Sequence, residues 1–169
     1  MALIKDRKLT HDPWLLLKAA ADGVTAPVPQ GGDILVPLAL WHSARGELLG
    51  RAGRLGLWLA GDQEPGDIAD DLQHFDLIAV DFPRFTNGRG YSLARLLRER
   101  YGWRGELRAI GEIQRDQLAY LARCGFDAFD LRDSDEAEAA LSAFGEFSES
   151  YQASVDQPVP LFRRRGAVG

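Results

Sequence analysis

The chain has 169 residues, of which 46% are hydrophobic and 27% charged, and its formal net charge is −5 at pH 7. This length leaves room for one domain with a substantial core, and the composition is that of an ordinary globular protein. The acidic balance disfavours a nucleic-acid-binding protein. The single cysteine, Cys124, excludes an internal disulfide, a cysteine-based metal cluster and a CxxC redox pair within the chain.

The sequence also bears on where the protein works. No apolar run approaches the length of a membrane span, and the first eight residues become charged too early for a signal peptide. The histidines are not spaced like metal ligands; they are His11, His42 and His74. We therefore expect a cytoplasmic protein that binds no membrane, and we predict neither a metal site nor a cofactor.

The predicted elements begin with a short hairpin in residues 3–16, around the polar turn at 5–8. Residues 20–33 are rich in glycine and proline, which is typical of a loop. Apolar runs then alternate with helical patterns. Strands are predicted at 34–38, 55–59, 75–82, 106–110 and 126–131. Helices are predicted at 41–52, 67–73, 93–101, 113–124 and 134–147, with Gly125 after the fourth as a C′ residue and Ser134–Glu136 capping the last.

This alternation predicts an α/β fold of about five βα units with a mostly parallel sheet, preceded by a short N-terminal hairpin. Five units are too few to close an eight-stranded barrel, so the sequence leaves two alternatives, an open sheet and a partial barrel. We expect a single domain over residues 1–152. Residues 153–169 contain prolines and Arg163–Arg165 and are predicted to form an extended or flexible tail.

The segment 82–95 lies between a predicted strand and a predicted helix, and it is crowded with arginines, aromatic residues and glycines. Such loops meet at the carboxyl ends of parallel strands, where ligands usually bind. Forked guanidinium donors, flexible glycines and free amide groups at a helix start favour an anion. The predicted anion- or partner-binding residues are Arg84, Asn87, Gly88, Arg89, Gly90, Tyr91, Ser92, Arg95 and Arg115. The alternative is a rigid connection in which the arginines pair with acidic neighbours and Tyr91 packs.

The segment 111–117 follows the next strand and is expected at the same edge of the sheet. Glu112 and Asp116 are the candidate acid–base residues, whereas the alternative is that they only stabilise the first turn of a helix. The acidic segment 61–71 does not have the spacing of a calcium loop and is interpreted as a solvated face.

Together, residues 82–100, the stretches 105–109 and 115–117, and residues 123–129 resemble a proteobacterial family of unknown function. The resemblance covers about residues 3–151. Its members are typically encoded beside sulfite reductase genes and are labelled as oxidoreductases of sulfite reduction. The resemblance implies a place in assimilatory sulfate or sulfite reduction, but the sequence shows no dinucleotide, flavin, iron–sulfur or siroheme motif that supports the label.

Three functional readings follow. The first is an accessory protein that docks sulfite reductase or another sulfate-assimilation enzyme, or that holds a sulfur oxyanion, through the arginine-rich edge. The second is a small enzyme that acts on an anionic substrate, with Glu112 or Asp116 as acid or base. The third is a small-molecule binding module without turnover. An enclosed cleft with a carboxylate facing the arginines would favour the enzyme, whereas a flat basic edge with aromatic residues would favour docking. A homo-oligomer is compatible with all three readings.

Overall fold

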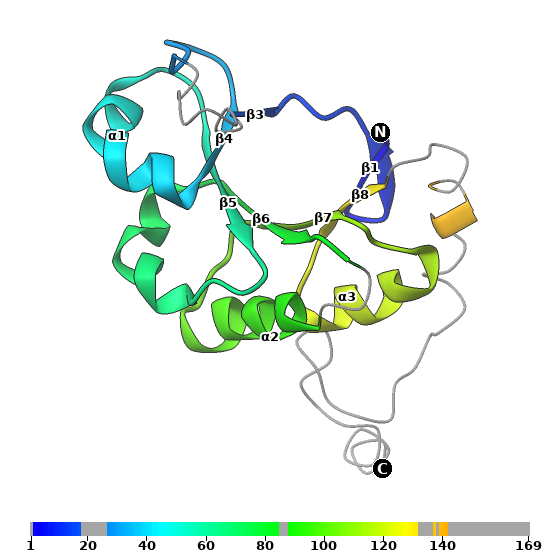
Figure 1. The fold of residues 1–169 in the computed structure, drawn as a ribbon. Coiled ribbons are helices and arrows are strands. Elements are labelled where there is room, and N and C mark those ends of the chain that lie inside the picture. Colours follow the sequence, from blue (N-terminus) through cyan, green and yellow to red (C-terminus); the bar gives the residue numbers. More distant parts are fainter. Residues whose placement is uncertain (1, 18–26, 85–87, 132–136, 138, 142–169) are drawn as a thin grey trace, which may run out of the picture.

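One curled sheet of eight strands forms the centre of the molecule in the computed structural model, which describes residues 2–17, 27–84, 88–131, 137 and 139–141 (Figure 1). The order of the strands is β2-β1-β8-β7-β6-β5-β4-β3. The strands are β1 (Ala2–Lys5), β2 (Lys8–Thr10), β3 (Leu15–Leu16), β4 (Ile34–Pro37), β5 (Leu55–Ala60), β6 (Leu77–Phe82), β7 (Glu106–Gly111) and β8 (Ala128–Leu131). Strands β3 to β8 are parallel, and β1 is antiparallel to both β8 and β2. The predicted α/β class, the mostly parallel sheet and the N-terminal hairpin are confirmed.

The helices lie on the convex side of the sheet (Figure 1). They are α1 (Leu38–Gly50), η1 (Pro65–His74), α2 (Arg89–Arg95), η2 (Leu96–Arg100), η3 (Arg115–Gln117) and α3 (Leu118–Cys124). Strands that follow one another from β4 to β8 are neighbours in the sheet. Because right-handed crossovers without a reversal of strand order place every helix on the same side, the sheet curls into a half-barrel.

The two faces of the sheet carry different cores. On β6, Ile78, Val80 and Phe82 belong to the large core beneath the helices. Leu77 and Ala79 face the other way, in a small cluster on the concave inner face, where Trp14 and Trp58 pack against them. Side chains of a strand alternate between faces, so the next inward position on β6 is Asp81.

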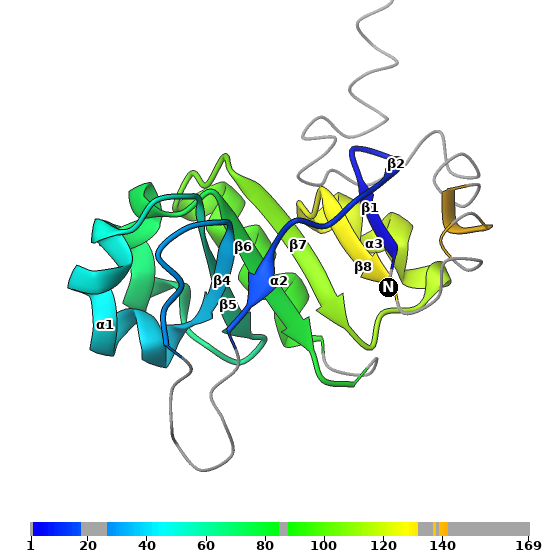
Figure 2. The ribbon, with the colours of Figure 1, turned by 90° about the horizontal axis from the view of Figure 1, so that it is seen from above.

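The N-terminal segment joins both edges of the half-barrel. Strand β1 pairs with β8 at one edge and β3 pairs with β4 at the other, so the chain between β2 and β3 crosses the inner face (Figure 2). We call residues 11–17 the strap. Asp12 of the strap accepts a 2.8 Å hydrogen bond from Arg108, and the Trp14 ring lies over the Arg54 guanidinium at 5.0 Å. The hairpin was predicted from the sequence, but the return of the chain to the opposite edge was not.

The helix after β6 begins earlier than predicted. It starts at Arg89 instead of residue 93, and Gly88 is its N-cap. A Cβ atom at Gly90 would lie 2.5 Å from Cζ of Phe82, so only glycine fits in this first turn. Because glycine is a poor helix former, the sequence pattern did not indicate this first turn of the helix. Ser92 therefore lies one turn inside the helix, not at its start.

Other boundaries shift less. The short helix after β5 begins at Pro65, earlier than predicted, and has 3-10 geometry. The predicted helix 113–124 consists of the 3-10 turn η3 followed by α3, and Gly125 closes it with a φ of 111° as predicted. No helix in the described part of the chain is long and apolar enough to cross a membrane. The Ser134–Glu136 cap, most of the last predicted helix and the tail from residue 153 lie outside the described residues.

Candidate functional site

Three strand-to-helix connections meet at the carboxyl ends of β5, β6 and β7, and we call this edge the rim. The backbone N–H of Glu112 donates a 2.7 Å hydrogen bond to the carbonyl of Phe82, which joins the ends of β6 and β7. A Cβ atom at Gly61 would lie 3.1 Å from the carbonyl oxygen of Asp81 and 3.4 Å from the backbone nitrogen of Gly90. The connection after β5 therefore packs closely against the start of α2.

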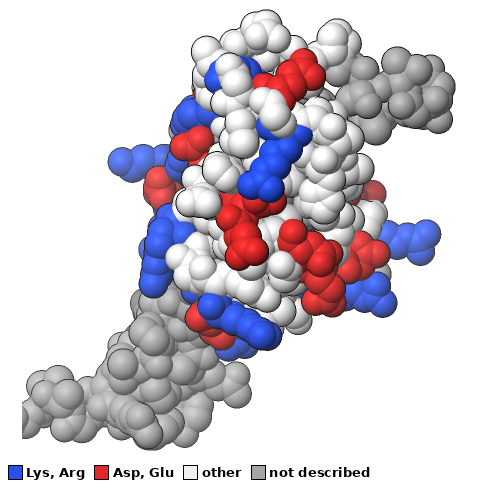
Figure 3. Space-filling model, turned by 90° about the vertical axis from the view of Figure 1, so that its left-hand side faces the viewer, with Lys and Arg blue, Asp and Glu red and all other residues white. Residues whose placement is uncertain are grey.

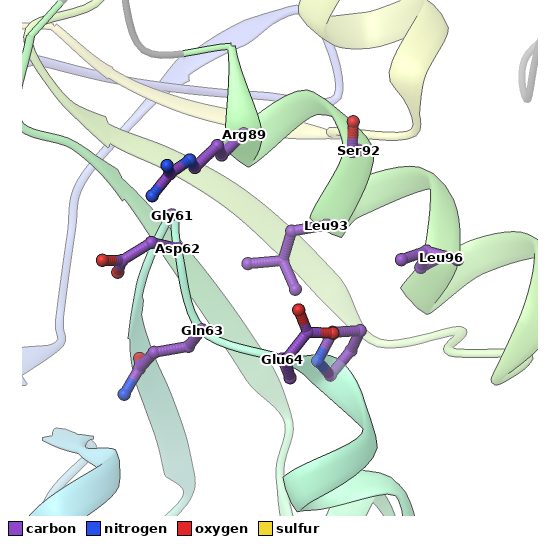
Figure 4. A pocket seen from close by; sticks show the side chains of 9 residues that line it. Gly61, Asp62, Gln63, Glu64, Arg89, Ser92, Leu93 and Leu96 are labelled. Atoms are coloured by element: carbon purple, nitrogen blue, oxygen red, sulfur yellow. The ribbon is translucent and has the colours of Figure 1, made fainter.

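A cleft of about 360 Å³ lies between the connection after β5 and α2 (Figure 4). Its lining residues are Gly61, Asp62, Gln63, Glu64, Pro65, Arg89, Ser92, Leu93 and Leu96. Arg89 extends from the start of α2 toward Gly61 and Asp62, whereas Leu93 points into the space above Glu64 (Figure 4). The structure thus brings two of the predicted anion-binding residues, Arg89 and Ser92, to one cleft.

The charge of this cleft differs from that of an anion cradle. Asp62 and Glu64 line it together with a single guanidinium, that of Arg89. Acidic side chains also gather on the side of the molecule that carries α1 (Figure 3). The connection after β5 and η1 contribute Asp62, Glu64, Asp67, Asp70 and Asp71. Two carboxylates beside one guanidinium oppose the binding of a small dianion at this place.

The sequence analysis did not assign Asp62 and Glu64 to a site, because it interpreted their segment only as a solvated face. A signal was present. Both residues follow β5. Because β5 and β6 are parallel neighbours, the residues after β5 lie at the same edge of the sheet as the segment after β6.

The other predicted arginines lie apart from the cleft. Arg95 at the end of α2 is exposed and forms an ion pair of 3.4 Å with Glu99 of η2, which continues directly from α2. Arg84 and Arg115 are exposed on the connections after β6 and β7, and neither guanidinium group makes a hydrogen bond or ion pair with another described residue. The expected pairing of the arginines with acidic neighbours is therefore not seen for these two in the described ranges.

The glycines of the rim have structural roles. Gly88 has a φ of −75°, and neither it nor Gly90 has a positive φ. Gly90 allows the first turn of α2 to approach the Phe82 ring closely. Asn87 lies outside the described residues.

Tyr91 links the core to the surface of the rim. Its ring contacts Phe82 at a centroid distance of 5.3 Å and Tyr120 at 5.1 Å. Burial raises the pKa of the Tyr91 hydroxyl, with smaller contributions from Cys124, Tyr120 and Asp116. Tyr120 on α3 is 53% exposed. Tyr120, whose ring packs against Tyr91, is thus presented to solvent on the helix that follows the turn with Arg115.

The two candidate acid–base residues do not line the cleft. Glu112 and Asp116 are both exposed, and Asp116 lies in the first turn of η3. Gln114 and Gln117 form a reciprocal capping box at this turn, which ties the segment to local helix structure. Cys124 is buried. Within the described ranges, no three His, Cys, Asp or Glu side chains are grouped closely enough to hold a metal ion.

Comparison with known proteins gives one family. A family model described as a bacterial protein of unknown function, DUF934, matches residues 56–162. No curated protein matches the sequence significantly. The matched range begins in β5 and includes the connections after β5, β6 and β7 that form the rim. Since the match covers more than half of the chain, the protein belongs to the DUF934 family of bacterial proteins.

Proposed function

We propose that the protein is an accessory protein of assimilatory sulfate or sulfite reduction that docks an acidic surface of a reductase through its rim. One observation supports this proposal above the others. Arg84 and Arg115 are exposed at the ends of neighbouring strands, and their guanidinium groups make no hydrogen bond or ion pair with another described residue. Guanidinium groups in this state can bind carboxylates of a partner without first breaking an internal ion pair.

The aromatic side chains of the rim support docking as well. Tyrosine and arginine are enriched among the residues that dominate protein–protein binding energy. Tyr120 is exposed, is held by its contact with Tyr91, and lies on α3 directly after the turn that carries Arg115. A basic group and an exposed aromatic ring therefore lie on consecutive elements, which is the pattern that we associate with a docking surface.

The charge of the cleft argues against the alternative that the protein holds a sulfur oxyanion there. The cleft that contains Arg89 is also lined by Asp62 and Glu64. The two arginines without an internal partner lie outside this cleft. A carboxylate-bearing protein surface fits exposed cations outside a cleft better than one small dianion does.

A second candidate function is small-molecule binding in the cleft beside α2. The observation that favours it is the convergence of Arg89 and Ser92 with two carboxylates and the apolar side chains of Leu93 and Leu96. The enzyme reading stays a prediction, and its proposed residues, Glu112 and Asp116, are outside that lining.

A pull-down from sulfate-grown cells tests the docking proposal. The tagged wild-type protein is compared with the double variant Arg84→Ala/Arg115→Ala and with a matched control, Arg100→Ala/Arg104→Ala. The control removes the same charge just before β7, at the opposite end of the sheet. We expect sulfite reductase, or another enzyme of the pathway, with the wild type and the control but not with the rim variant.

Two outcomes would contradict the proposal. Equal recovery with all three proteins would show that the rim arginines do not dock the partner. Recovery of no sulfate-assimilation enzyme with any of them would remove the accessory role. The variant Arg89→Ala separates the second candidate, because it changes the cleft and leaves Arg84 and Arg115 in place.

A further inference from the structure

The cleft beside α2 combines an apolar wall with carboxylates that have no internal partner. Leu93 points into it, and Leu96, which is 37% exposed, lines it from the same helical stretch (Figure 4). Asp62 and Glu64 line it from the connection after β5. Neither carboxylate makes a hydrogen bond or ion pair with another described residue. An apolar wall next to such carboxylates fits an occupant that has an apolar part and a cationic part.

The acidic surface continues from the cleft along η1, on the side of the molecule where acidic side chains gather (Figure 3). Asp67 and Asp70 are exposed, and their carboxylates also make no hydrogen bond or ion pair with another described residue. Asp71 differs, because it accepts a 2.7 Å hydrogen bond from Trp41 and forms a 2.6 Å ion pair with Arg45. The cleft and the exposed part of η1 therefore present uncompensated carboxylates to one occupant.

One segment of the chain has the composition that this surface requires. Leu161 and Phe162 are followed directly by Arg163–Arg165, the one run of three consecutive basic residues in the sequence. The family match reaches residue 162, so the cleft residues and this apolar pair lie in the same matched range. We call residues 161–165 the basic segment. Its apolar pair matches the leucines of the cleft, and its arginines match the carboxylates.

The length of the chain lets the basic segment reach the cleft. The segment lies outside the described residues, and the last described residue, Leu141, precedes Leu161 by 20 positions. An extended chain of this length spans up to about 70 Å. A domain of this size is about 40 Å across. The connection therefore places no limit on binding within one molecule.

We propose that the basic segment binds the cleft of its own chain, with Phe162 against Leu93 and Leu96 and with its arginines on the carboxylates of the cleft and of η1. Exposed ion pairs are individually weak, so the apolar contact supplies much of the affinity and the binding is reversible. A cleft filled in this way is closed to a small-molecule ligand until the segment leaves. The proposal does not rest on reductase docking, because Arg84 and Arg115 lie outside the cleft.

Zero-length cross-linking with a carbodiimide tests the proposal on the full chain. This reagent joins a lysine amine to a carboxylate in contact with it, so Arg163–Arg165 are all changed to Lys, which keeps the charge. Arg95→Lys in the same protein gives the reference cross-link, because Arg95 pairs with Glu99 and both side chains are exposed. Among residues 2–131, we expect the three new lysines to be joined mainly to Asp62 and Glu64, and not to Glu47, an exposed carboxylate of α1.

Two further variants separate the apolar and the charged contributions. Phe162→Ala should lower the yield of these cross-links by about fivefold or more, because the aromatic ring loses its burial against the leucines. Val168→Ala, an apolar change beyond the basic residues, is the matched control and should leave the yield unchanged. Asp62→Asn/Glu64→Gln should lower the yield of any cross-link to Asp67, because the segment then leaves the neighbouring cleft.

Three results would overturn the proposal. The first is the reference cross-link without any link from the basic segment to the cleft. The second is an even spread of links over Glu47, Asp67 and Asp116, which indicates attraction to the overall negative charge only. The third comes from a mixture of unlabelled and isotope-labelled protein: links between a labelled and an unlabelled chain would place the segment on a second copy.

Discussion

Arg108 shows at the scale of one residue how the inner face is held together. Its side chain is 2% exposed, and it binds Glu106 on its own strand and Asp12 of the strap. Glu106 also accepts a 2.7 Å hydrogen bond from Lys5 on β1. The ion pairs of Arg108 with Glu106 and Asp12, and of Lys5 with Glu106, connect β7, the strap and β1, which are far apart in sequence. The sequence showed only a lone arginine in an apolar strand and did not reveal its partners.

We predict that Arg108→Met destabilises the protein by about 3 kcal/mol, because breaking a buried ion pair leaves charge that is only partly compensated. Lys5 still pairs with Glu106 in this variant, which limits the loss. Urea denaturation followed by circular dichroism measures the effect. Arg104→Met, an exposed change just before the same strand, serves as the control and should stay within about 0.5 kcal/mol of the wild type. A loss of less than about 1 kcal/mol for Arg108→Met would contradict this role.

Helix α2 determines the shape of the rim at the scale of one element. Its first turn carries Arg89 into the cleft, and Gly90 lets this turn pack directly on the Phe82 ring. Tyr91 contacts the same core aromatic and packs against Tyr120. The position of the rim thus depends on Gly90, which lets the first turn of α2 pack on Phe82.

We predict that Gly90→Ala destabilises the protein by about 1–3 kcal/mol. Alanine in place of glycine inside a helix ordinarily stabilises by about 1 kcal/mol. Here the contact of 2.5 Å with the Phe82 ring outweighs that gain. Gly88→Ala is the matched control, since a Cβ atom there has no neighbour within 4 Å. Thermal unfolding of the two variants decides the question, and a Gly90→Ala protein as stable as Gly88→Ala would show that α2 shifts away without cost.

At the scale of the whole molecule, alternation of apolar strands and helices was sufficient to predict the α/β class, the parallel sheet and the edge where the candidate site lies. The prediction worked because each strand from β4 to β8 is continuous in sequence and buried against the helices. The strap could not be predicted, because β3 has only two residues and its partner strand begins 18 residues after its end.

The cleft and the distribution of charge around it could not be predicted from the sequence either. Arg84, Arg89, Arg95 and Arg115 looked equivalent in sequence. In the structure one side chain lines a cleft, one pairs with Glu99, and two side chains have no hydrogen bond or ion pair in the described part of the chain. This separation makes docking by Arg84 and Arg115 the central functional claim.

Binding between the purified protein and purified sulfite reductase tests that claim most directly, measured by calorimetry at low and at physiological salt. The account predicts that the wild type and Arg100→Ala/Arg104→Ala bind with equal affinity, and that higher salt weakens both. For Arg84→Ala/Arg115→Ala it predicts a loss of about tenfold or more together with a weaker salt dependence. Equal affinity of the rim variant and the control, or no binding by the wild type, would contradict it.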